Sequence, residues 1–258
     1  MKLFSLFLTF YSLSTFALTG KEIAEKVYSS NREFDTIQTS EMKLIDKSGN
    51  TRERSFTTFA IDNNRYDSKS LIVFSKPKKV SKTSMLTYNQ KGDNSLQWLY
   101  LPALKKSRKI SSSKKSGRFV GSDIFFEDLE DREVDLDNHK LLKTIKKNGS
   151  ITYKVQSTPK DKSSSSYKKS LIFVDAKSWL VKKVIFYKKG KKPLKTLTVK
   201  EVKKIGKTYI PILTSVTHHK LKHKTIIKVL KTKFNNKLKD SFFKKSVLEK
   251  PSKLKKYL

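Results

Sequence analysis

Short apolar runs with the spacing of β-strands recur along most of the chain. Runs rich in Val, Ile, Thr, Phe and Tyr are separated by turn-forming segments such as Lys-Ser-Gly-Asn at 47–50. The predicted strands span eleven ranges: 40–46, 51–62, 69–75, 83–90, 96–101, 151–158, 170–175, 180–188, 194–203, 209–217 and 225–234. Because the connections are short, the pattern predicts a mainly β protein with one large meandering antiparallel sheet.

The N-terminal part has a different pattern. Ile23, Ala24 and Val27 have helical spacing, which predicts an amphipathic helix over 20–31. Before it, Lys2 precedes an apolar run that ends in Ser-Thr-Phe-Ala at 14–17. A membrane-spanning helix needs about 20 apolar residues, and this run is shorter and is interrupted by serine and threonine. We therefore predict a signal peptide at 1–17, cleaved near Ala17, and a single domain at 18–258.

Composition limits the chemistry that the chain can perform. There are 16 Phe and 10 Tyr, enough for a real core, and no Cys, so neither a disulfide framework nor a thiol nucleophile exists. The formal net charge is +35 at pH 7, which attracts nucleic acid, anionic lipid surfaces or acidic proteins. Only seven of the basic residues are Arg, so a compositional bias toward Lys is the alternative explanation.

Two segments interrupt the β pattern. Residues 103–121 are basic and rich in Ser, and residues 123–137 carry eight carboxylates. The two segments could pair with each other across a lid. Paired carboxylates can also perform acid–base chemistry at a sugar bond, but a solvated, charge-balanced loop is the simpler interpretation.

Catalytic motifs are absent from the sequence. It has no G-x-S-x-G, H-E-x-x-H, phosphate-cradling or dinucleotide-binding motif, so we expect neither an enzyme nor a cofactor. His218, His219 and His223 form a sequence cluster. On a strand, His219 and His223 would share a face but lie too far apart to bind one ion, so we predict no metal site.

Several blocks of residues stand out in the first half of the chain: Gly-Asn-Thr-Arg-Glu-Arg at 49–54, Phe-Ser-Lys-Pro at 74–77, Trp-Leu-Tyr-Leu-Pro-Ala-Leu at 98–104, and Gly-Ser-Asp at 121–123 followed by Glu-Asp-Leu at 127–129. Together they resemble the outer-membrane lipoprotein-sorting, LolA-like family of periplasmic proteins. Order and spacing match over about residues 40 to 130, and the C-terminal half matches mainly in layout. The resemblance implies a half-open β-barrel with a few helices covering an apolar cavity.

The resemblance also implies a periplasmic carrier that binds the acyl chains of lipoproteins or lipids and moves them toward the outer membrane. Expected partners are the acylated cargo, membrane donor and acceptor proteins, and an anionic membrane surface, and we expect a monomer that binds no nucleic acid. The alternative is an envelope sensor or adaptor of the same fold that binds an acidic protein without carrying lipid.

Site candidates follow from both arguments. Lipid or cavity contacts are expected from five aromatic residues: Trp98, Tyr100, Phe119, Phe125 and Phe126. Basic residues near the cavity rim, where they would steer anionic head groups, are Arg52, Arg54, Arg108, Lys109 and Arg118. Core packing is the alternative for the aromatic side chains, and ordinary sheet-surface charge is the alternative for the basic ones. Residues 103–129 are the candidate lid.

Overall fold

Every predicted strand range overlaps a strand of one sheet in the computed structural model, which describes residues 18–64, 67–92 and 95–250. The signal peptide predicted at 1–17 lies outside the described residues. Within them the sheet has thirteen strands: β1 (Asp35–Ile45), β2 (Thr51–Asn64), β3 (Asp67–Lys76), β4 (Ser84–Gln90), β5 (Leu96–Leu101), β6 (Lys106–Lys109), β7 (Asp137–Lys147), β8 (Ser150–Pro159), β9 (Lys169–Asp175), β10 (Val181–Tyr187), β11 (Lys195–Ile205), β12 (Thr208–His218) and β13 (His223–Phe234).

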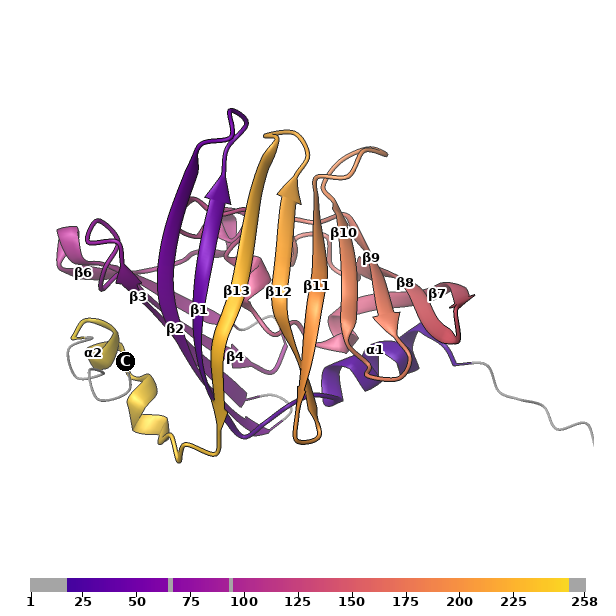
Figure 1. Cartoon of the computed structure of the whole chain (residues 1–258), viewed down its shortest axis with the longest axis horizontal. Coiled ribbons are helices and arrows are strands. Elements are labelled where there is room, and N and C mark those ends of the chain that lie inside the picture. Colours follow the sequence, from indigo (N-terminus) through magenta and orange to yellow (C-terminus); the bar gives the residue numbers. More distant parts are fainter. Residues whose placement is uncertain (1–17, 65–66, 93–94, 251–258) are drawn as a thin grey trace, which may run out of the picture.

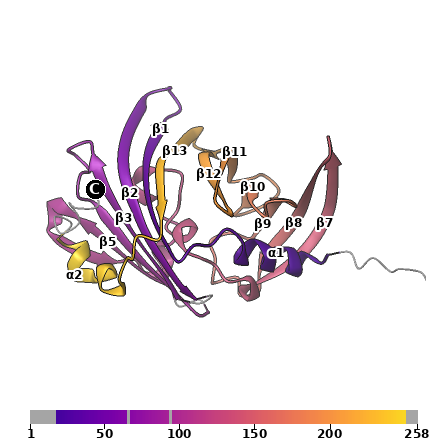
Figure 2. The same cartoon turned by 60° about the horizontal axis from the view of Figure 1, so that its bottom comes forward.

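The strand order is β6-β5-β4-β3-β2-β1-β13-β12-β11-β10-β9-β8-β7, and all neighbours are antiparallel. Because β6 and β7 are edge strands and do not pair with each other, the sheet stays open. It curves into the half-barrel that the resemblance implied (Figures 1 and 2). The predicted meander is confirmed, with two additional strands.

The helical elements are short. The α-helices are α1 (Gly20–Ser29) and α2 (Lys245–Leu248). The 3-10 helices are η1 (Pro102–Leu104), η2 (Ser112–Lys114), η3 (Phe119–Gly121), η4 (Glu127–Leu129), η5 (Val134–Leu136) and η6 (Asp240–Phe243). The helix predicted over 20–31 is therefore confirmed as α1. Residues 110–136, which connect the two halves of the sheet, are called the crossing segment below.

The sheet has an inner face, which carries α1 and the crossing segment, and an outer face. Around β1–β5 both faces are covered. On the inner face, Phe119 and Phe126 of the crossing segment pack against Met42, Leu44 and other strand residues. On the outer face, residues 238–248 pack against a cluster that includes Phe59 and Leu71. This half of the sheet therefore forms the main core, and the other half is left to shape a pocket.

Candidate lipid-binding site

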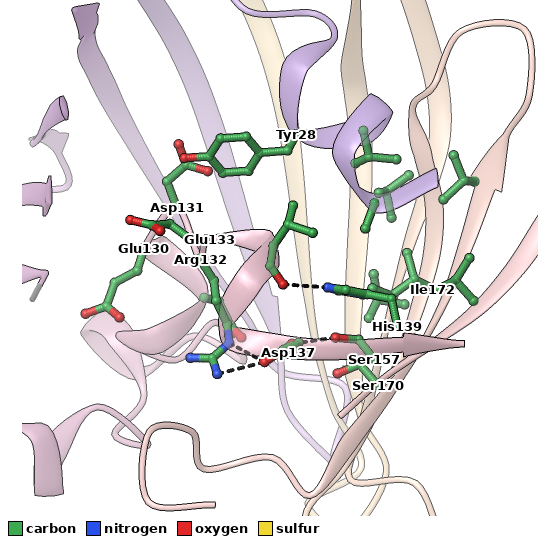
Figure 3. Close-up of a pocket in the computed structure, with 18 of the residues that line it drawn as sticks. Tyr28, Glu130, Asp131, Arg132, Glu133, Asp137, His139, Ser157, Ser170 and Ile172 are labelled. Atoms are coloured by element: carbon green, nitrogen blue, oxygen red, sulfur yellow. Dashed lines mark hydrogen bonds and ion pairs between the residues drawn. The ribbon is translucent and has the colours of Figure 1, made fainter. Parts of the chain in front are cut away.

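A pocket of about 570 Å³ lies between α1 and the inner face of the second half of the sheet (Figure 3). The volume is in the range of about 300–1,000 Å³ that is usual for small-molecule sites. Its apolar wall is built from α1 and strands β8–β11: Ile23, Ala24, Val27, Val155, Ile172, Val174, Val181, Val184, Phe186 and Leu197. Such a wall suits an apolar ligand.

Strand alternation explains why this wall is apolar. Val155, Ile172, Val184 and Leu197 are successive partners across β8, β9, β10 and β11, so they form one row on the inner face. Their sequence neighbours point to the outer face, because side chains alternate along a strand. The row presents four branched aliphatic side chains side by side to the pocket.

Helix α1 closes the pocket because its first residue lies directly on β7. A Cβ atom added to Gly20 would lie 2.6 Å from the backbone nitrogen of Leu141 and 2.7 Å from the carbonyl oxygen of His139, so only glycine allows this approach. Thr19 and Glu22 form a capping box that satisfies amide groups at the helix start. Ile23 is fully buried against Val155 and Val174.

One end of the pocket is polar and is built mainly by the acidic part of the crossing segment (Figure 3). Arg32 pairs with Asp131 at 2.8 Å and also with Asp62. Arg132 donates to Asp137 at 2.7 and 2.9 Å. These pairs balance two of the eight carboxylates of residues 123–137, Asp131 and Asp137, as expected for a charge-balanced loop.

Tyr28 lies at the same polar end of the pocket. Burial, followed by the charge of Asp131, raises the pKa of Tyr28 to about 12. The phenol therefore stays protonated at neutral pH and presents a hydroxyl group beside the carboxylates.

Lys195 ties the crossing segment to the sheet from beneath the pocket. Its ammonium group pairs with Asp128 and donates to the carbonyl oxygen of Asp123 at 3.2 Å. It also lies 3.8 Å from the ring centre of Phe125, and the rings of Tyr167 and Phe186 lie 5.2 and 5.0 Å away. Burial lowers the pKa of Lys195, and the charge of Asp128 opposes that shift.

Tyr167 completes this arrangement. Its hydroxyl donates to Asp128 at 2.7 Å, and burial together with that carboxylate raises the pKa of Tyr167 well above its ordinary value. Since Asp128, Tyr167 and Phe186 all line the pocket, the Lys195 cluster (Lys195, Asp128, Tyr167, Phe125 and Phe186) forms part of the pocket wall.

A second buried contact holds the crossing segment further along. Asp123 is fully buried and accepts hydrogen bonds from Thr225 at 2.7 Å and Arg118 at 3.1 Å, and its Oδ2 lies 2.7 Å from Nδ1 of His223. The Gly-Ser-Asp and Glu-Asp-Leu blocks thus supply Asp123 and Asp128, the two residues that fasten the segment to β11 and β13.

The five aromatic residues that were predicted to contact cargo do not line this pocket. Trp98 and Tyr100 lie on the outer face, in the cluster covered by the C-terminal residues. Phe119 and Phe126 lie on the inner face within the main core. Phe125 comes nearest to the pocket, because its ring stacks on Tyr167 with centroids 6.0 Å apart. Contact between these five residues and a cargo stays a prediction.

The five basic residues that were predicted near the cavity rim also do not line this pocket. Arg108 and Lys109 are exposed on the edge strand β6. Arg118 holds Asp123, and Arg54 donates to the carbonyl oxygen of Val120 in the crossing segment. Arg54 also lines a second hollow of about 700 Å³ together with Lys43, Glu53, Lys76 and other charged residues, and Arg52 is exposed beside it on β2. That charged lining makes the second hollow a poorer apolar site.

The histidine cluster is arranged differently from the prediction. His218 ends β12 and His223 begins β13, so they are cross-strand partners, and His219 lies in the turn between them. The expectation that His219 and His223 share a strand face was wrong, because residues 219–222 form a hairpin turn. Among the residues that the structure describes, no group of three or more His, Asp or Glu side chains is placed to hold a metal ion.

Sequence reasoning missed Tyr167 as a pocket residue and Lys195 as the residue beneath it. Lys195 is one of 58 basic residues, and only its position within an otherwise uncharged strand stretch, Leu194 to Val199, marks it. Tyr167 follows four serines at 163–166, a composition that is typical of a flexible connector. Two of those serines, Ser165 and Ser166, donate to Glu127, so the connector is fixed to the crossing segment.

Known proteins share this architecture. A family model with the description "Uncharacterized protein" matches residues 66–250. A crystal structure described as an outer membrane lipoprotein-sorting protein domain from Vibrio parahaemolyticus is 31% identical; the match covers 89% of this chain and 98% of that one, with a TM-score of 0.84. No curated protein matches the chain.

Two further structures agree. A DUF1329 family protein from Desulfovibrio piger is 26% identical, with 89% of this chain and 97% of that chain covered and a TM-score of 0.83. A LolA superfamily protein from Nitrosomonas europaea shares the fold at 17% identity, with 89% and 99% covered and a TM-score of 0.71.

Within the described residues, no helix has the length and apolar character needed to cross a bilayer. The curved, open sheet, the pocket under α1 and the 31% identity over nearly the whole lipoprotein-sorting domain lead to one assignment. The chain belongs to the outer-membrane lipoprotein-sorting, LolA-like family.

Proposed function

We propose that the protein is an exported, periplasmic carrier that binds the acyl chains of lipoproteins or lipids and moves them toward the outer membrane. In this proposal residues 1–17 are a cleaved signal peptide and residues 18–258 form one non-enzymatic domain. It acts as a monomer between a membrane donor and an acceptor protein.

The observation that carries the proposal is the apolar pocket between α1 and strands β8–β11. Each methylene group that leaves water contributes about 0.8 kcal/mol, so a long acyl chain gains on the order of 10 kcal/mol in total. Val155, Ile172, Val184 and Leu197 offer a continuous row along which such a chain can lie. The polar end near Tyr28 and Asp131 would receive the part of the cargo that stays hydrated.

Because binding is this favourable, release needs a moving element. The crossing segment overlaps the lid that the sequence suggested at 103–129, and it reaches the pocket wall through Asp128. Breaking the contacts of Asp123 and Asp128 would free it from the sheet and join the pocket to the inner-face core around Phe119 and Phe126. In that opened state the predicted phenylalanines contact cargo, and the basic residues Arg54 and Arg118 lie beside it.

Mass spectrometry of solvent-extracted protein, purified from its native envelope without detergent, tests the proposal. We expect near-stoichiometric acyl lipid or acylated peptide. Ala24→Trp, which puts an indole into the pocket, should lower that amount at least about fivefold, since the indole takes the place of acyl carbons. Ser29→Trp, on an exposed site of the same helix that does not line the pocket, is the matched control.

An adaptor that binds an acidic protein is the second candidate, and the net charge of +35 favours it. A wild-type protein that is empty after purification, with no difference between Ala24→Trp and Ser29→Trp, would support the adaptor and contradict the carrier. Partner crosslinking in the envelope would then identify the acidic protein.

A further inference from the structure

The outer face of β7–β10, directly behind the pocket wall, carries basic and apolar side chains in alternation. One cross-strand row reads Lys143, Lys154, Phe173 and Lys183, and the next reads Lys140, Gln156, Leu171 and Ile185. Lys169 pairs with Tyr187 beside them. We call these ten residues the outer basic face. The ten residues carry a charge of +5, and Asp175, which ends β9 on the same side, places one negative charge next to them.

Contacts within the face hold its lysines over its aromatic rings. The ammonium groups of Lys154 and Lys183 both lie 5.7 Å from the ring centre of Phe173, and that of Lys169 lies 5.1 Å from the ring centre of Tyr187. These three lysines are half-buried, whereas Lys140 and Lys143 are exposed. The face is therefore apolar near the sheet and positively charged at its surface.

The other half of the sheet lacks this character. There the outer face is covered by the C-terminal residues, which pack on β1–β5. Further along the outer face, Glu41 and Glu53 stand beside Lys43, and the Lys43–Glu53 distance is 3.5 Å. An excess of positive charge together with partly exposed apolar side chains therefore sets the outer face of β7–β10 apart from that of β1–β5.

We propose that the outer basic face docks the protein on an anionic phospholipid surface. A layer of lysines above aromatic and aliphatic side chains complements a membrane interface, where phosphate groups lie above acyl chains. Each lysine close to an anionic bilayer strengthens binding about fivefold. Because the face and the pocket are opposite sides of the same strands, docking leaves the α1 side free. This inference goes beyond the proposed cargo site.

A lipid surface fits better than an acidic protein for a geometric reason. The lysines are spread over four strands rather than gathered at one point that would fix the orientation of a folded partner, whereas a fluid bilayer adapts to a curved face. Leu171, Phe173 and Ile185 between the charges can enter the headgroup region, which a purely ionic contact would not use.

Cosedimentation with sucrose-loaded vesicles tests the inference. The vesicles contain phosphatidylcholine with about one third phosphatidylglycerol, or phosphatidylcholine alone, at about 0.1 M salt. The test variant is Lys143→Gln/Lys154→Gln/Lys183→Gln. The control, Lys79→Gln/Lys105→Gln/Lys106→Gln, removes the same charge from the turn after β3 and from the β6 end of the sheet, far from β7.

We expect wild-type binding to the anionic vesicles only, a loss of about 100-fold in the test variant and less than about threefold in the control. Equal losses in both variants, or no wild-type binding to anionic vesicles, would overturn the inference. Circular dichroism melts confirm that both variants are folded. Cargo content, measured by mass spectrometry, should not change in the test variant. Vesicle binding thus tests the docking face, and cargo content tests the carrier proposal.

Discussion

Lys195 is the residue on which the position of the crossing segment depends most directly. It is fully buried, within reach of three aromatic rings, and its charge is balanced mainly by Asp128. Removing one partner of a buried ion pair leaves an uncompensated charge and costs about 3–5 kcal/mol. Lys195→Met should lose free energy of unfolding in this range, measured by urea denaturation.

Lys200→Met is the matched control, because Lys200 is exposed on the same strand and its removal should change stability by less than about 0.5 kcal/mol. The double variant Lys195→Met/Asp128→Asn should lose less free energy of unfolding than the two single variants lose in sum, because no unpaired charge then remains. Unchanged stability in Lys195→Met would contradict the role given to this pair.

His218 gives the fold a dependence on pH. Burial lowers its pKa below 6.5, the nearby Asp123 opposes this shift, and Arg118 and Lys195 add to it. Above pH 6.5 the imidazole is neutral in both the folded and the unfolded state. As the pH falls below 6.5, the unfolded state takes up a proton first, so stability decreases until the folded-state pKa is passed.

Urea denaturation at about pH 7.5 and about pH 5 measures this effect. The wild type should lose more stability between the two values than His218→Gln, whereas the exposed His219→Gln should behave like the wild type. The same pH dependence in His218→Gln and the wild type would contradict the role given to His218.

At the scale of elements, the pocket depends on the close approach of α1 to β7. A side chain at Gly20 would meet backbone atoms of His139 and Leu141 rather than a side chain that can rotate away. Gly20→Ala should therefore displace the start of α1 and cost about 1–3 kcal/mol. Hydrogen exchange should show faster exchange in α1, with β1–β5 unchanged.

Ser29→Ala, at the exposed end of the same helix, separates this effect from a general loss of helix stability. It should leave the exchange of α1 within about 0.5 kcal/mol of the wild type. If Gly20→Ala exchanged like Ser29→Ala, the contact with β7 would not be what positions the helix.

Elements with a strong apolar pattern could be predicted from the sequence, and polar ones could not. The range predicted at 96–101 is β5 to the residue, and the helix expected at 20–31 is α1. Strand β7 was missed because four of its eleven residues are Lys and its outer side faces solvent, and β6 because it is a four-residue polar edge strand. Edge strands need little apolar surface, so periodicity carries little signal there.

The candidate site was harder to predict than the fold for a related reason. Val155, Ile172, Val184 and Leu197 look like ordinary core residues in the sequence, and only the strand order makes them one row. Trp98 and Tyr100, which the sequence makes conspicuous, lie on the outer face under the C-terminal residues. Register across four strands is a tertiary property, so a local pattern could not indicate it.

At the scale of the whole molecule, two halves of one sheet have different tasks. The half formed by β1–β5 is covered on both faces and supplies the main core. The half formed by β7–β11 has the pocket on its inner face and, over β7–β10, the outer basic face on its other side. A stable half can therefore support a half whose surfaces are kept open for ligands.

The net charge of +35 affects all of these parts, because like charges repel one another in the folded state more than in the expanded chain. The Debye length falls from about 30 Å at 0.01 M salt to about 8 Å at 0.15 M. Sodium chloride over this interval should therefore raise the melting temperature, by roughly 2–4 °C for each kcal/mol of repulsion removed. Calorimetry or circular dichroism measures the change.

The buried Lys195–Asp128 pair is screened little by salt, so it should not offset the rise in melting temperature. Lys143→Gln/Lys154→Gln/Lys183→Gln removes three neighbouring charges and should melt higher than the wild type at 0.01 M salt, with a smaller salt response. A melting temperature that falls with salt would mean that attractive ion pairs outweigh repulsion. The lysines over β7–β10 would then not destabilise the fold, and binding to anionic lipid would not be needed to explain why they are present.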